Sequence, residues 1–179
     1  MHPAPGSPLR RFFAGLAEYT FQSQLGVADP PLVDYISDLL TRFTRCETMY
    51  RVRDPKGHSL TEVAELMVEA DQRLGQSRRE VHRHIGDFTL FWIGVYPEAV
   101  AKRSQHASKD CLIDYASQGK KAYRIASRLE GDADRSAPSE LLERLSDRFE
   151  LCAYGLREVR REWERRDGDA PPKRPVILG

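Results

Sequence analysis

The stretch FTLFWIGVY, residues 88–96, decides the fold of this 179-residue chain. It continues a pattern in which Val81, Ile85 and Phe88 recur at helical spacing, and Pro97 follows it. A helix that is apolar on every side is normally buried at the centre of a protein, because it leaves no polar face for water. The same composition also favours a β-strand, which is the local alternative. We expect a central buried helix here.

Capping residues and prolines mark the helices on either side of this stretch. Ser59 with Glu62 and Ser77 with Glu80 have the spacing of capping boxes, in which side chains and backbone groups bond reciprocally at a helix start. The apolar stripes on either side are followed by a glycine or, after residues 32–50, by the turn at 54–57, and these signals predict where the helices end. The predicted helix starts are Ser7, Asp29, Ser59, Ser77, Pro97 and Ser108.

The last predicted helix, which follows the loop 131–138, has an apolar seam with alternating steps of three and four residues. Such a heptad seam packs against a neighbouring helix, either within the chain or in a second copy. Because the seam is longer than a small bundle requires, we expect a homodimer. The seam residues are Leu142, Leu145, Phe149, Cys152, Leu156, Val159 and Trp163.

Together these patterns predict an all-α, single-domain bundle of five or six helices with a long C-terminal heptad-patterned helix. We expect a flexible N-terminus over residues 1–7, the bundle over 8–166, and an extended or disordered tail over 167–179. The apolar run Val176–Leu178 in the tail could dock on a partner chain.

The composition argues against binding that depends on overall charge. The 28 Lys and Arg residues and 27 Asp and Glu residues leave a formal charge of +1, which gives no strong attraction to nucleic acid or an anionic membrane. No apolar run approaches the ~18 residues of a membrane span, and the start of the sequence lacks a signal-peptide apolar region. Cys46, Cys111 and Cys152 suggest neither a disulfide framework nor a zinc site. We therefore expect a cytoplasmic protein.

Motifs of the common enzyme classes are absent from the sequence. It has no Walker A loop, no GxGxxG, HExxH or GxSxG motif, no EF-hand loop and no CxxCH haem attachment. A b-type haem held by histidine leaves no motif and stays open. The sequence therefore defines no cofactor.

Polar side chains on apolar faces are the candidate site residues. Glu47 continues the apolar stripe of residues 32–43, where an unpaired buried carboxylate is costly. His84 points into the bundle beside the central apolar stretch, whereas His82 is expected to be exposed. Asp87 lies three residues after His84, a spacing that suits either a shared ligand or a structural hydrogen bond.

A metal site is one use for these residues. A ferritin-like di-iron site would need a second Glu-x-x-His pair, which the sequence lacks. A single metal ion, a haem or a small polar ligand held around His84, Asp87 and Glu47 is less demanding. The candidate metal ligands are His84, Asp87, Glu47, Glu18 and Asp114, with Asp110 as an alternative to Asp114.

Arg79 and His84 have the arginine-to-histidine spacing of a known motif. In this one short segment the chain resembles the HEPN class of helical ribonucleases. Residue 80 is Glu, whereas that class usually has Asn or Asp after the arginine. The resemblance implies an RNA-cleaving activity.

The helix expected from Ser108 to Leu129 mixes tyrosines with basic residues. Tyr115 falls on its inner stripe, so we expect core tyrosines beside a solvated basic face rather than a stacking platform for nucleic acid. Small residues such as Gly119 and Ala122 on that stripe would let the stretch 88–92 approach closely.

Two functions remain for the chain. The first is a non-enzymatic interaction or regulatory module that works through its surface, through its C-terminal helix and tail, and as a homodimer. The second is a bundle with an internal metal, haem or small-ligand site. A HEPN-like ribonuclease is a further alternative.

Overall fold

The computed structural model describes residues 7–103, 110, 113–130 and 137–167, and within these residues the chain folds into helices. The all-α class is confirmed, although nine α-helices are described rather than five or six. In chain order the elements are α1 (Pro8–Glu18), the π-helical turn η1 (Tyr19–Gln24), α2 (Pro30–Phe43), α3 (Cys46–Met49), α4 (Val63–Gln72), α5 (Gly75–Val95), α6 (Pro97–Arg103), α7 (Tyr115–Arg128), α8 (Ser139–Asp147) and α9 (Phe149–Asp167).

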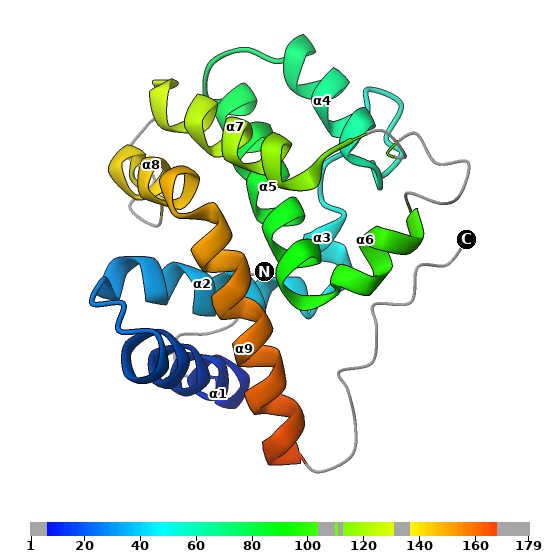
Figure 1. Cartoon of the computed structure of the whole chain (residues 1–179). Helices are drawn as coiled ribbons and strands as arrows, with labels where there is room; N and C mark the ends of the chain where they lie inside the picture. The colour runs from blue at the N-terminus through cyan, green and yellow to red at the C-terminus, as the bar shows by residue number, and fades with distance from the viewer. Residues whose placement is uncertain (1–6, 104–109, 111–112, 131–136, 168–179) are drawn as a thin grey trace.

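Helix α5 runs through the middle of the molecule (Figure 1) and packs against α2, α4, α6, α7 and α9. Every residue from Val81 to Trp92 is buried, as expected of a helix that is apolar on all sides. The central-helix prediction is therefore confirmed and the strand alternative is wrong. In the described part of the chain, β-type pairing is limited to one isolated bridge, between Arg53 and Ser59. None of the helices described has the length and apolarity to cross a bilayer.

The first two helix starts follow the sequence prediction. The Ser7 hydroxyl accepts a hydrogen bond from the backbone N–H of Arg10 at 3.3 Å, and a carboxylate oxygen of Asp29 accepts one from Leu32 at 3.3 Å. In both cases proline follows the cap, where its missing N–H costs nothing. Pro97 opens α6, also as predicted.

Both predicted capping boxes are wrong. Helix α5 begins at Gly75, and α4 begins at Val63. A residue remote in sequence caps α4 instead, because the two carboxylate oxygens of Asp110 accept hydrogen bonds from the N–H groups of Val63 and Ala64, each at 2.9 Å. The Tyr115 hydroxyl donates to the same carboxylate at 2.6 Å. A tertiary contact therefore replaces the local capping signal at this helix start.

Two other boundaries differ from the prediction. Helix α2 ends at Phe43, where the hydroxyls of Thr41 and Thr44 donate to backbone carbonyls, and a separate short helix α3 follows. Helix α7 begins only at Tyr115, after the Asp114 carboxylate caps it, and Ser108 lies outside the described residues.

The predicted last helix is two helices, because the chain bends at Arg148 between α8 and α9. Six of the seven seam residues are buried within the chain. The seventh, Trp163, packs edge to face on Phe13 with ring centroids 5.0 Å apart. Helix α9 contacts α1, η1, α5, α7 and α8, so the seam is filled from inside the molecule. It therefore offers no argument for a homodimer.

The most extensive helix contact joins α5 to α7. A Cβ added at Gly86 would lie 2.6 Å from ring atoms of Tyr123, and one added at Gly119 would lie 2.6 Å from the ring of Phe149 and would also meet Thr89. Gly119 of α7 therefore lets Thr89 of the 88–92 segment approach closely, as predicted, whereas at Gly86 the small residue is on α5 and the ring is on α7. Glycine is required at both positions because a methyl group has no space there.

We expect Gly86→Ala and Gly119→Ala each to lower the free energy of unfolding by about 1–3 kcal/mol through overpacking. Gly15→Ala is the matched control, because a Cβ there meets nothing within 4 Å and alanine favours a helix interior by about 0.5–1 kcal/mol. Urea unfolding measures all three. Equal effects at the three positions would contradict the close α5–α7 contact.

Candidate functional site

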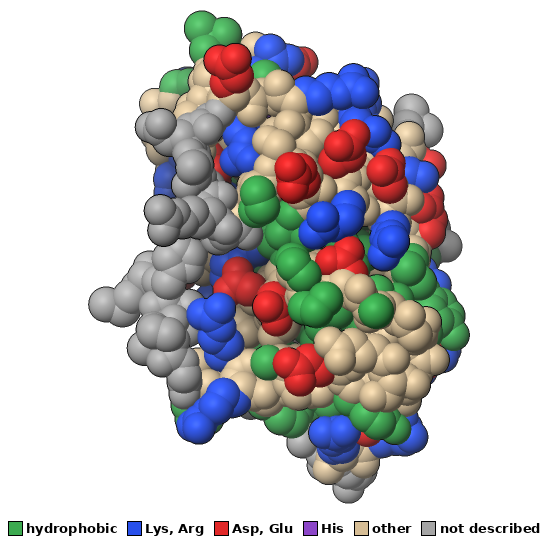
Figure 2. All heavy atoms as spheres, turned by 90° about the vertical axis from the view of Figure 1, so that its left-hand side faces the viewer, with side chains coloured by type: hydrophobic (Ala, Val, Ile, Leu, Met, Phe, Trp, Pro, Cys, Tyr) green, Lys and Arg blue, Asp and Glu red, His purple; other side chains and the backbone are tan. Residues whose placement is uncertain are grey.

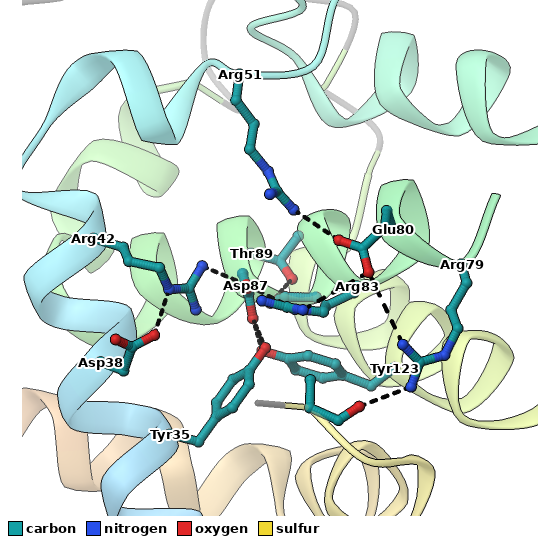
Figure 3. A network of polar contacts seen from close by, with 12 residues as sticks. Tyr35, Asp38, Arg42, Arg51, Arg79, Glu80, Arg83, Asp87, Thr89 and Tyr123 are labelled. Carbon is teal, nitrogen blue, oxygen red and sulfur yellow. Dashed lines mark hydrogen bonds and ion pairs between the residues drawn. The ribbon is translucent and has the colours of Figure 1, made fainter. Parts of the chain in front are cut away.

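The carboxylate of Asp87 lies at the centre of a buried polar cluster (Figure 3). One of its oxygens accepts hydrogen bonds from the hydroxyls of Tyr35 on α2, at 2.6 Å, and Tyr123 on α7, at 2.8 Å. The other oxygen accepts from the Arg42 guanidinium at 3.1 Å and lies 4.0 Å from Nε of Arg83. Three helices are thus joined through one side chain.

The cluster keeps Asp87 ionised. Burial by itself would raise the pKa of Asp87, but Arg42, Arg83 and the two tyrosine hydroxyls favour the charged form, and the net pKa lies below its ordinary value. Burial and the neighbouring carboxylate raise the pKa of Tyr35 and of Tyr123. Such a fully bonded carboxylate is a weak proton acceptor, so it anchors structure rather than acting as a general base.

A chain of charges leads from the cluster to the surface (Figure 3). The Glu80 carboxylate lies 3.8 Å from Arg83, 3.9 Å from Arg79 and 3.4 Å from the half-exposed Arg51. The Arg79 guanidinium also donates to the backbone carbonyl of Ala137 at 2.7 Å. The charges are therefore paired along α5 from its interior outward.

His84 is fully buried, as predicted, but it is not bonded to Asp87. Its ring packs against Phe43 and Phe88, with centroids 5.8 and 6.1 Å apart, and neither ring nitrogen has a well-formed hydrogen bond. Burial, with a smaller contribution from Arg51, lowers the pKa of His84 to about 3 against the opposing effect of Asp87. The imidazole is therefore neutral at physiological pH.

The other predicted ligands lie elsewhere. The expectation that Glu47 is buried is wrong, because α2 stops at Phe43 and Glu47 lies exposed on α3. Glu18 and Asp114 are also exposed, and Asp114 serves as the cap of α7. Within the described residues, no group of three or more His, Cys, Asp or Glu side chains is arranged to hold a metal ion.

The HEPN-like pair is enclosed in the protein. Arg79 and His84 are both buried on α5, and Arg79 is already bonded to the Ala137 carbonyl. A ribonuclease site must contact a phosphodiester group, so this structure gives the pair no accessible site. On the face seen in Figure 2, the described Lys and Arg side chains are interspersed with Asp and Glu, which agrees with the formal charge of +1.

Several residues of the cluster were not predicted from the sequence. Tyr35 and Arg42 lie seven residues apart at the edge of the apolar stripe of α2, and Arg83 stands four residues before Asp87 on α5. The four-residue spacing of Arg83 and Asp87, which favours an ion pair on a helix, was the one sequence signal for this cluster. The partners on α2 and α7 could not be identified without the fold.

A surface groove lies along one side of α4. It has a volume of about 490 Å³ and is formed by α4 and the preceding loop. Leu60, Ala64 and Val68 supply apolar walls, and Asp54 and Glu65 stand among the residues that line it. This groove is a candidate for contact with another chain.

A second hollow lies between α4, α5 and α7, with His82 in its wall. The expectation that His82 is exposed is wrong, because only 6% of its surface is accessible. Burial is the main cause that lowers the pKa of His82, and the positive charge of Arg78 adds to it.

Comparison of the chain with protein-family models, with curated proteins and with solved structures found no match. The function is therefore argued from the geometry of the chain itself.

We expect Asp87→Asn to lower the free energy of unfolding by about 3–5 kcal/mol at neutral pH, because it leaves buried guanidinium groups without a counter-charge. Since the pKa of Asp87 is lowered by folding, its contribution is complete above the unfolded value of about 4 and disappears as the pH falls through the folded value. Urea unfolding at several pH values measures both effects.

Asp147→Asn is the matched control, because Asp147 pairs with Arg124 at the surface and exposed pairs contribute about 0–1 kcal/mol. A loss in Asp87→Asn no larger than that in the control would contradict the anchoring role.

His84→Leu should make the protein less sensitive to acid. The unfolded chain binds a proton at His84 below about pH 6.5, whereas the folded chain, with a pKa of about 3, does not. The wild type therefore loses several kcal/mol more than the variant between these values, at about 1.4 kcal/mol for each pKa unit. Parallel stability curves for the two proteins from neutral pH to about pH 4 would show that His84 does not titrate in this way.

Proposed function

We propose that the chain is a non-enzymatic interaction module that self-associates. In the assembly, the segment 173–178 of one copy occupies the α4 groove of another. The observation that carries the proposal is the groove itself, an apolar channel with a negatively charged lining. The segment 173–178 lies outside the described residues, and only its sequence enters the argument.

Apolar side chains are exposed at the groove and next to it. Val68 is 59% exposed on α4, and Leu74, just beyond the end of α4, is 81% exposed. Exposed apolar surface that borders a hollow is typical of sites where proteins meet. Covering it would remove apolar area from water, which is favourable by about 25 cal/mol per Å².

The charges of the groove and of the segment are complementary. Asp54, Glu65 and Glu69 line the groove, and no Lys or Arg stands among the described residues that line it. Arg73 pairs with Glu69 from outside the lining at 2.7 Å, which still leaves a surplus of negative charge. The sequence KRPVIL, residues 173–178, places two cations and then one proline before three aliphatic residues. Such complementarity favours one partner over others and speeds its association.

The geometry favours binding of the segment 173–178 to the α4 groove of another copy over binding to the groove of its own chain. Helix α9 ends at the lower end of the molecule, whereas α4 lies at its upper end (Figure 1). The nine residues 168–176 span at most about 30 Å. That is about the length of α9 itself, ~28 Å for its 19 residues. A segment that runs back along α9 is therefore used up before it reaches α4. Two reciprocal contacts between copies would close a dimer.

We also propose that the protein works in the cytoplasm, where thiols stay reduced. Cys46 and Cys152 are free thiols, and burial raises the pKa of Cys152 to about 12, which makes that thiol unreactive. Self-association that depends on concentration then gives the module a regulatory output without any chemical step.

Sedimentation velocity tests the proposal with the full chain. The wild type should associate as its concentration rises from about 1 to about 200 µM. Val68→Asp places a charge in the groove, and Ile177→Asp places a charge in the segment that is proposed to bind there. Each variant alone should therefore stay monomeric. A mixture of the two variants should associate one to one, because one groove and one segment remain intact.

Leu151→Asp is the control, since Leu151 is an exposed apolar residue on α9, away from the groove. It should associate like the wild type. A wild type that is monomeric over the whole range, or a mixture that does not associate, would overturn the proposal.

A further inference from the structure

A partly enclosed pocket of about 250 Å³ lies between α4, α5 and α7, on the side of α4 away from the groove. Its lining includes the apolar side chains of Ile85 and Ile125. The polar groups around it come from all three helices: Asp71 from α4, Arg78 and His82 from α5, and Gln118 and Lys121 from α7.

Two buried nitrogen atoms at this pocket have no hydrogen-bond partner among the described residues. They are Nε2 of His82 and Nε of Arg78. Buried polar groups in folded proteins are nearly always bonded, and each exception needs an explanation. His82 is more than nine-tenths buried and lines the pocket, so a molecule that enters the pocket can supply the missing partner.

The pocket carries a surplus of positive charge. The charged groups that act on His82 are Arg78, Lys121 and Asp71. The Asp71 side chain is 77% exposed and lies 3.7 Å from Arg78, so solvent weakens this ion pair. With His82 neutral the three charges sum to +1, and the sum rises by one when His82 is protonated.

We propose that this pocket binds a small molecule through an oxyanion, that is, a phosphoryl or carboxylate group. Arg78 and His82 donate hydrogen bonds to the oxyanion from α5, and Lys121 supplies a second positive charge from α7. Gln118 lies on the same wall and bonds the rest of the ligand, while Ile85 and Ile125 pack against its carbon atoms. The site is independent of the α4 groove, so either proposal can fail alone.

The volume limits the ligand to a small metabolite. A water molecule occupies about 30 Å³ of the liquid, so the pocket holds the equivalent of about eight waters. An oxyanion with a short carbon chain fits this space. A nucleic acid or a protein segment does not.

Isothermal titration calorimetry with sulfate tests the site in the wild-type protein, with chloride at matched ionic strength in the reference. Sulfate should bind saturably at one site per chain. Arg78→Gln and Lys121→Gln should each weaken binding about tenfold, because each removes a charged hydrogen-bond donor. Both side chains are at least partly exposed, so both variants should fold.

Lys120→Gln is the matched control, because it removes the same charge from the neighbouring position, where the side chain pairs with Glu150 on α9. It should change the affinity less than about twofold. Absence of saturable binding, or equal weakening by Lys120→Gln and Lys121→Gln, would overturn the proposal, because only general attraction to positive charge would then be measured.

The pH dependence gives a second readout. Sulfate remains a dianion throughout, so a change in its affinity reports on the protein. Because a bound anion favours the charged imidazole, binding should tighten as the pH falls from about 8 to 6. His82→Gln, which keeps an N–H donor but does not titrate, should bind sulfate without this dependence. An unchanged pH profile in His82→Gln would remove His82 from the site.

Methyl phosphate and propionate, compared in the same assay, distinguish the two kinds of oxyanion. A dianionic phosphoryl group should bind more tightly than a carboxylate if both Arg78 and Lys121 contact the ligand. Tighter binding of propionate than of methyl phosphate would assign the site to carboxylates.

Discussion

A carboxylate without access to water has to find its hydrogen-bond donors inside the protein, and the carboxylate of Asp87 finds them on three different helices. Tyr35 and Arg42 approach it from α2, Arg83 from its own helix and Tyr123 from α7. Charge burial is tolerated only with such a complete set of partners. One side chain therefore links α2 and α7 to α5, and the tight contact at Gly86 packs Tyr123 against α5.

The central helix is divided into two chemically different halves. From Phe88 onward its side chains are mostly apolar and form part of the core, where α5 packs against α9. Toward its N-terminus it carries Arg78, Arg79, His82 and Arg83, and it meets α4 and α7 there. The ligand pocket lies at this polar end, and α4 separates it from the groove proposed for self-association. Both proposed functions therefore depend on α4, one on each of its sides.

The sequence identified the fold class and the centre of the molecule, because apolar periodicity reports burial directly. It placed His84 and Asp87 inside and aligned the small residues of α7 with the 88–92 segment. It failed where a distant residue takes over a local role, as Asp110 does in capping α4, and where the last helix breaks at Arg148. Glu47 was misplaced because α2 ends after Phe43, so the helical spacing of the stripe 32–43 no longer applies to it. His82 was missed because α7 covers a face of α5 that looks solvent-exposed in the sequence.

The hydroxyl protons of Tyr35 and Tyr123 test the central claim most directly. Proton NMR in water near neutral pH should show two tyrosine hydroxyl resonances that exchange slowly, one absent from Tyr35→Phe and the other from Tyr123→Phe, because both protons are buried and bonded to the Asp87 carboxylate. If both hydroxyl protons exchange too quickly to be seen in the folded protein, the cluster is open to water and Asp87 does not hold the three helices together.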